Sequence, residues 1–211
     1  MRILALGAHP DDIEYGCGGL LLQAVAAGHE VTLHVLTDGG LHPRVNRRAE
    51  QEQAAEFLGA RRLLWGGFRD TRLKADRRLI VAIEKSLETT TPDLVLVNDP
   101  HDAHQDHQAL ASCAITACRY VKRVLFYHDY TTMGFMPDTF VDIGEVLEKK
   151  RRLLACHKSQ VNKSYPTGLD ILESVTALAA YYGFMAKVRY AEGFRPLRYL
   201  LTIPPLNRRK E

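Results

Sequence analysis

The fold is decided by the stretch Ile3-Leu4-Ala5-Leu6-Gly7-Ala8-His9-Pro10-Asp11-Asp12-Ile13-Glu14-Tyr15-Gly16-Cys17-Gly18-Gly19. The apolar run 3–6 is short enough to be a buried strand, and the apolar run 20–27 suits a helix packed on a sheet. His9, Asp11 and Asp12 are then expected on the turn that leaves the first strand. In an open α/β sheet, ligands bind at this carboxyl end of the strands.

The composition is that of an ordinary globular protein. Of the 211 residues, 46% are hydrophobic and 25% are charged, so we expect a single domain that spans 1–211. The net charge of +3 is small and the basic residues are scattered, which argues against a nucleic-acid partner. The four cysteines have no paired spacing, no secretory signal is visible, and no apolar run approaches the ~20 residues of a membrane span. These features predict a cytoplasmic protein without a membrane span.

Apolar runs typical of strands alternate with amphipathic stretches typical of helices. The expected strands are 2–8, 31–37, 61–65, 93–97 and 123–127, and the expected helices between them are 17–28, 46–59, 75–89 and 105–119. Beyond 128 the pattern loosens to a strand at 139–143, helices at 144–157 and 169–187, and a last strand at 198–203. This alternation predicts an α/β fold with a mostly parallel sheet and helices on both faces.

A second polar cluster, Asn98-Asp99-Pro100-His101-Asp102-Ala103-His104-Gln105-Asp106-His107, follows the fourth strand. In a doubly wound sheet, strands one and four are neighbours at the switch point. The two polar turns are therefore expected to face each other across one crevice. Either turn alone is explained as a loop with helix-capping aspartates, but the two together favour a metal site.

Three side chains are the expected metal ligands: His9 and Asp12 from the first turn and His107 from the second. Two imidazoles and one carboxylate leave coordination positions open, as a catalytic zinc needs for water. The same set suits ferrous iron or another divalent ion, so the metal stays open between Zn²⁺ and Fe²⁺.

The remaining polar side chains of the two turns suit acid–base roles. Asp11 cannot easily bind the same ion as Asp12, because successive side chains diverge, so we expect it to be the general base beside the water. His104 precedes His107 by three residues and faces the same way on a helical turn. We expect His104 to stabilise an oxyanion as a cation, with its ring held by Asp106 or Asp102.

The glycines Gly16-x-Gly18-Gly19 invite comparison with a dinucleotide-binding loop. That fingerprint requires a further glycine at position 21, where this chain has Leu21. Asp11, Asp12 and Glu14 would also repel a pyrophosphate. We therefore expect the glycines to allow close packing of the helix on the sheet.

The sequence resembles the LmbE-like or PIG-L-type zinc-dependent N-deacetylases. Their first signature, Ala-His-Pro-Asp-Asp-x-Glu-x-Gly-x-Gly-Gly, is complete from Ala8 to Gly19, and their second, Asp-x-His-x-Asp-His, spans Asp102 to His107. The resemblance implies a Rossmann-like fold and removal of acetyl from N-acetylglucosamine units on various aglycones. It also implies a homo-oligomer, commonly a hexamer. By the same resemblance, His9, Asp12 and His107 bind zinc and Asp11 is the general base. His104 stabilises the tetrahedral intermediate, and Asp106 adjusts His104.

Substrate contacts are less clear from the sequence. Arg47 and Asp70 are the candidates for sugar contacts, and surface charge or a structural salt bridge explains them equally well. The segments 38–46 and 128–138 match no subgroup, so the aglycone stays open. Two other classes of function also stay open: a ferrous oxygenase, and a sugar-binding or regulatory module that has lost catalysis.

Overall fold

The computed structural model describes residues 1–40 and 45–201. The strands are β1 Arg2–Gly7, β2 Glu30–Thr37, β3 Arg62–Phe68, β4 Leu94–Asn98, β5 Arg123–Tyr127, β6 Thr139–Asp142 and β7 Ala191–Tyr199. The α-helices are α1 Asp12–Ala26, α2 Arg47–Leu58, α3 Arg77–Thr90, α4 Gln105–Ala117, α5 Leu147–Leu154, α6 Lys158–Val161 and α7 Ile171–Ala186, and a 3-10 turn spans Gly144–Val146.

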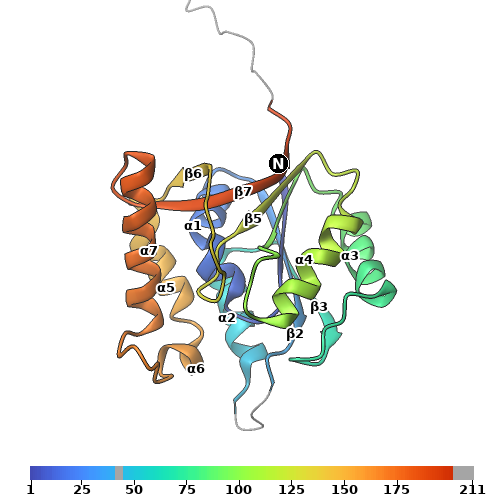
Figure 1. Ribbon diagram of the computed structural model, residues 1–211, viewed down its shortest axis with the longest axis horizontal. Helices are drawn as coiled ribbons and strands as arrows, with labels where there is room; N and C mark the ends of the chain where they lie inside the picture. The colour runs from blue at the N-terminus through green and yellow to red at the C-terminus, as the bar shows by residue number, and fades with distance from the viewer. Residues whose placement is uncertain (41–44, 202–211) are drawn as a thin grey trace, which may run out of the picture.

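The strands form one mostly parallel sheet with the order β3-β2-β1-β4-β5-β7-β6 (Figure 1). The first five strands along the chain are parallel, and β1 pairs with β4 through Ile3, Leu4 and Ala5. β7 is antiparallel to both of its neighbours, β5 and β6. The expected adjacency of strands one and four is thus confirmed, and the switch point of the sheet lies between them.

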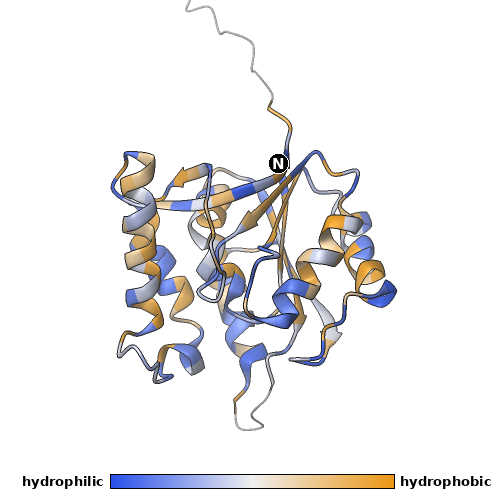
Figure 2. Ribbon diagram, in the orientation of Figure 1, coloured by the Kyte–Doolittle hydropathy of each residue, from blue (hydrophilic) through white to orange (hydrophobic). Residues whose placement is uncertain are grey.

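Helices cover both faces of this sheet. One core packs α1, α2 and α5 against side chains such as Ile3 and Ala5 of β1. The other core packs α3 and α4 against the alternate side chains Leu4 and Leu6 of the same strand. Figure 2 shows that the central strands are mostly hydrophobic, whereas the helices around them carry both hydrophobic and hydrophilic residues. The expected α/β fold with helices on both faces is therefore confirmed. Within the described residues, no helix is long and apolar enough to cross a membrane.

The expected elements are present, with two notable shifts. The first helix begins at Asp12, five residues before the expected start at 17, and its backbone departs from helical angles at Cys17. The last strand, expected at 198–203, instead spans Ala191–Tyr199. That prediction was wrong because it followed the apolar run at 199–203, whereas the strand is selected by pairing with β5 on one side and β6 on the other. Residues 202 and 203 lie outside the described part of the chain.

The glycines after the first polar turn serve close packing. A Cβ at position 16 would overlap the ring of Tyr127 on β5, so only glycine lets α1 approach the sheet there. Beyond the irregularity at Cys17, the backbone N–H groups of Gly19 and Leu20 donate to the Glu192 carboxylate at 2.7 and 2.8 Å. The helix therefore restarts with a carboxylate at its new N-terminus, where the dipole favours an anion.

Candidate metal and catalytic site

The side chains of three residues meet at the switch point of the sheet. His9 lies on the turn after β1, Asp12 is the first residue of α1, and His107 lies in the first turn of α4. Nδ1 of His9 lies 3.2 Å from Nε2 of His107, which lies 3.3 Å from Oδ2 of Asp12. Oδ1 of Asp12 lies 3.7 Å from Nδ1 of His9. The structure thus brings the three expected ligands together, and all three are buried.

Each imidazole directs its other nitrogen at a buried carboxylate. Nε2 of His9 lies 3.1 Å from Asp70 and 3.2 Å from Asp106, and Nδ1 of His107 lies 3.2 Å from Asp102. Such carboxylates accept the ring N–H and leave the opposite nitrogen free to bind a metal. Burial lowers the pKa of both imidazoles, but the neighbouring carboxylates outweigh it and hold each pKa above its ordinary value.

These donors fit a divalent ion. When the outer nitrogens carry protons, the inner nitrogens turn lone pairs toward each other and toward the Asp12 carboxylate. Facing lone pairs at 3.2 Å repel unless a cation or a proton lies between them. A tetrahedral zinc with bonds of about 2.0–2.1 Å separates its donors by about 3.3 Å. The two imidazole nitrogens are 3.2 Å apart, and Nε2 of His107 lies 3.3 Å from Oδ2 of Asp12. The same donors suit ferrous iron.

Two other sets of side chains in the described residues have metal-like spacing: His9 with His104 and His107, and His9 with Asp70 and Asp106. The second set uses the outer nitrogen of His9. Its member Asp106 is fully buried and already accepts the backbone N–H groups of Thr71 and Leu73. A metal held there would have less room for substrate than one held between His9 and His107.

Asp11 occupies a strained position next to these donors. It precedes α1 with a φ of 94°, in the left-handed region that costs a non-glycine residue about 1–3 kcal/mol. Oδ1 lies 2.7 Å from Nη2 of Arg47, whereas Oδ2 is buried and has no hydrogen-bond partner among the described residues. Burial raises the pKa of Asp11, and the charge of Arg47 opposes that rise. A carboxylate with one fixed and one free oxygen is suited to accept a proton.

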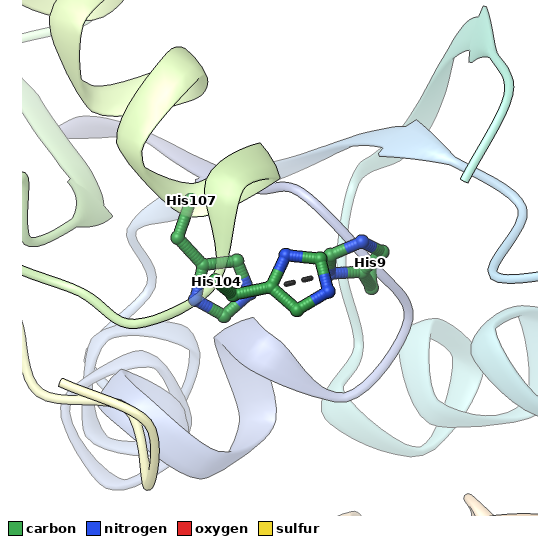
Figure 3. Close-up of side chains that lie close together, drawn as sticks. All are labelled: His9, His104 and His107. Atoms are coloured by element: carbon green, nitrogen blue, oxygen red, sulfur yellow. Dashed lines mark hydrogen bonds between the residues drawn. The ribbon is translucent and has the colours of Figure 1, made fainter. Parts of the chain in front are cut away.

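His104 lies beside the donors, next to both imidazoles. Its ring centroid is 4.6 Å from that of His9, and its ring stacks on His107 at 4.9 Å (Figure 3). Its Nδ1 accepts the backbone N–H of Asp106 at 3.2 Å. Burial and the two neighbouring imidazoles lower the pKa of His104. Both features favour a ring with its proton on Nε2, and the expected role of His104 as a cation stays a prediction.

The carboxylates expected to hold the His104 ring have other partners. Asp106 contacts His9, as described above. Asp102 contacts His107 and accepts the backbone N–H of His104, the residue before α4, at 2.8 Å. Neither carboxylate makes a hydrogen bond to the His104 ring in the described structure. The sequence placed both residues near the site but did not reveal which imidazole each one orients.

The two candidates for sugar contacts also have partners at the site. Arg47, at the start of α2, donates to the carbonyl of Pro10 as well as to Asp11. Asp70, after β3, contacts His9, and the charges of His9 and Arg47 help to lower its pKa against the effect of burial. Both still line a cleft of about 420 Å³ that exposes the donors. The structure thus gives both residues an ion-pair role and leaves the sugar contact as a proposal.

The sequence alone did not identify the part of the cleft that follows β5. Tyr130 lines the cleft, and the Asp129 carboxyl is fully buried without a hydrogen-bond partner among the described residues. Burial and the charge of Asp12 raise the pKa of Asp129. A signal was present, because a doubly wound sheet places the fifth strand beside the fourth, and the polar residues after it then border the same crevice.

The family model described as GlcNAc-PI de-N-acetylase (PIG-L) matches residues 4–118, which include both polar turns. A diacetylchitobiose deacetylase from Thermococcus kodakarensis is 30% identical over 223 residues, covering 92% of this chain and 82% of that protein. The uncharacterized deacetylase YaiS of Escherichia coli is 35% identical over 167 residues, covering 74% and 90%. The solved structure of N,N'-diacetylchitobiose deacetylase from Pyrococcus horikoshii superposes with a TM-score of 0.80 at 26% identity, covering 97% of this chain and 87% of that one.

Proposed function

Because the chain belongs to the PIG-L family of GlcNAc-PI de-N-acetylases, we propose that it is a metal-dependent hydrolase that removes acetyl from an N-acetylated amino sugar such as an N-acetylglucosamine conjugate. One observation carries the proposal. Three metal donors converge beside Asp11, whose Oδ2 has no partner among the described residues. A site that only binds sugar needs neither feature.

In this proposal His9, Asp12 and His107 hold the metal. A divalent ion bound there supplies a Lewis acid for the acetamide carbonyl and lowers the pKa of water. Zinc is our choice, since two imidazoles and a carboxylate with open positions suit it, and ferrous iron is the second choice. The carboxylates on the outer nitrogens orient both imidazoles.

The chain's own residues move the protons. Asp11 accepts a proton from the water whose oxygen attacks the acetyl carbonyl carbon. His104 donates its Nε2–H to the oxygen that gains negative charge. Asp11 then delivers its proton to the amide nitrogen as the carbon–nitrogen bond breaks, leaving acetate and a free amine. Arg47 holds Asp11 in place and opposes the rise of its pKa that burial causes.

We also propose that the protein works in the cytoplasm as a homo-oligomer. Its four cysteines are free, as is usual in a reducing compartment. Phe184 on α7 is 79% exposed, and large exposed aromatic side chains favour contacts between chains. The family resemblance implies a hexamer, and light scattering on the purified protein measures the mass of the particle. A monomer at all protein concentrations would contradict the oligomer.

The direct test is to incubate the purified chain with zinc and a panel of N-acetylglucosaminides. We expect primary amine and acetate to appear in equal amounts, to stop after chelation, and to resume when zinc is restored. Oxygen consumption without acetate would favour the ferrous oxygenase. Binding of the glycosides without release of either product would favour a module that has lost catalysis.

A further inference from the structure

A second cavity of about 510 Å³ opens between the first turns of α7 and the loops at 128–130 and 165–171. Its walls include Tyr15, Tyr130, Tyr165, Ala177 and Leu178. Cavities of this size commonly hold small molecules. None of the residues proposed to bind the metal or to move protons lines it, so the proposed chemistry does not explain it.

This tyrosine cavity adjoins the catalytic cleft, because Tyr130 lines both. The Tyr130 ring meets Tyr15 edge-on at 5.5 Å and Tyr165 edge-on at 6.4 Å. Lys163, which lines the cleft, lies 5.3 Å from the centroid of the Tyr165 ring. The cavity is therefore the neighbouring space for the far end of a molecule whose acetamide lies beside Asp11.

One polar atom at this boundary is left for a ligand. The hydroxyl of Tyr165 is buried and has no hydrogen-bond partner among the described residues. Burial and the charge of Asp11 raise its pKa to about 12, so it remains a neutral donor. By contrast, the Tyr15 hydroxyl is already paired with Ser174 at 2.8 Å. A buried unpaired hydroxyl costs free energy that a ligand oxygen can recover.

The charges around the tyrosine cavity select against an anion. No lysine or arginine is among the described residues that line it, and burial lowers the pKa of its one imidazole, His128. Its one carboxylate, Asp170, already accepts the backbone N–H of Glu173 at 2.7 Å and caps α7. Lys163 lies over the Tyr165 ring, but it lines the catalytic cleft and not the tyrosine cavity. An uncharged group is therefore the better match.

We propose that the tyrosine cavity is a second substrate subsite, which binds an uncharged ring joined to the amino sugar that is deacetylated. This inference rests on the proposed function and goes beyond it by assigning the other end of the substrate. The aromatic walls provide flat apolar faces for a ring, and the Tyr165 hydroxyl provides one donor. A second neutral sugar and an aromatic aglycone share this chemistry.

The test compares four substrates: the methyl, phenyl and 4-carboxyphenyl glycosides of N-acetylglucosamine, and diacetylchitobiose. The variant Ala177→Trp fills the cavity from an exposed position on α7 that is remote from the metal donors. Ala180→Trp is the matched control, because it places the same side chain at an exposed position of the same helix that does not line the cavity. The readout is kcat/KM for each substrate relative to the methyl glycoside.

In the wild-type protein we expect kcat/KM for the phenyl glycoside, for diacetylchitobiose or for both to be about five- to tenfold higher than for the methyl glycoside. This factor is the scale of one good aromatic contact. A preference for diacetylchitobiose alone identifies the ring as a sugar, and one for the phenyl glycoside alone identifies an aromatic group. The 4-carboxyphenyl glycoside should lose the advantage. Ala177→Trp should bring the ratios close to one, and Ala180→Trp should leave them unchanged. Equal kcat/KM ratios in wild type and Ala177→Trp would overturn the subsite. If Ala177→Trp changed only the oligomeric mass, the cavity would be a contact between chains, and the subsite would also be overturned.

A binding measurement separates this inference from the proposed function. Calorimetry with the amine products, phenyl and methyl glucosaminide, requires no turnover. Tighter binding of the phenyl product by wild type than by Ala177→Trp supports the subsite even if no acetyl group is released, in which case only the deacetylase proposal fails. Equal affinity of both proteins for the phenyl product overturns the subsite even if deacetylation is fast.

Discussion

Replacement of Asp11 by asparagine tests the proposed proton transfers. The amide keeps Oδ1 as an acceptor for Arg47, which lies 2.7 Å away, but it cannot take a proton from water. Loss of a general base slows turnover by about 10²–10⁴-fold, or roughly 2.7–5.4 kcal/mol of barrier. We expect kcat to fall by that factor while the zinc content stays at the wild-type level, because Asp11 is not among the proposed ligands.

The same substitution should leave stability intact, which separates a catalytic role from a structural one. Burial raises the pKa of Asp11 in the folded state, so the ionised carboxylate opposes folding once the pH exceeds its unfolded pKa. At neutral pH a neutral amide removes that penalty. We therefore expect the thermal midpoint of Asp11→Asn to lie within about 3 °C of wild type or above it.

The assay is release of primary amine from an N-acetylglucosaminide at saturating zinc, together with a thermal melt and elemental analysis of each protein. The control is Asp38→Asn, an exposed carboxylate after β2 that contacts the backbone of Gly40, a bond that asparagine retains. The control should turn over at the wild-type rate. Activity of Asp11→Asn within threefold of wild type would refute the reasoning, because the proton would then need another acceptor.

Three further substitutions test neighbouring contacts. Arg47→Ala removes the charge that opposes the rise of the Asp11 pKa. The acidic limb of the pH profile of kcat/KM should therefore move to higher pH, and a limb at the wild-type pH would contradict this role of Arg47. Asp102→Asn removes the carboxylate charge beside Nδ1 of His107. Zinc affinity, measured by chelator competition, should weaken about 10- to 100-fold, and an unchanged affinity would contradict this role of Asp102. Lys150→Met leaves a buried carboxylate without its cation and should cost about 3–5 kcal/mol, lowering the thermal midpoint by roughly 10 °C, with activity per folded molecule retained.

The parts of the site that the sequence could predict are those carried by local pattern. His9 and Asp12 follow directly after an apolar run, and the alternation of elements predicts that β4 lies beside β1. Their proximity to His107 follows from those two inferences alone. No knowledge of side-chain direction was needed, because parallel strands all end at the same edge of the sheet.

The parts that could not be predicted depend on side-chain direction over long sequence separations. The contact of Asp70 with His9 was not predicted, because it depends on the path of the loop after β3. The backbone N–H of Asp106 contacts Nδ1 of His104, which residue spacing cannot show. The junction of Tyr130 with Tyr165 likewise joins two loops without a periodic signal.

The shift of the last strand has a similar cause. β7 contains Pro196, which opposes Leu125 where the register with β5 changes, and it carries the buried Glu192. Proline and a charged residue argue against a strand when the segment is considered alone. Glu192 is tolerated because Lys150 lies 2.6 Å from it and α1 donates two N–H groups, none of which is near it in sequence.

The most direct test of the central claim is the zinc content of wild type and His107→Ala after zinc loading and removal of free metal. If the turns after β1 and β4 share one ion, wild type should retain about one zinc per chain, and His107→Ala should retain almost none although it keeps His9 and Asp12. Full zinc content in His107→Ala would contradict the shared site, since the first turn would then hold the metal by itself.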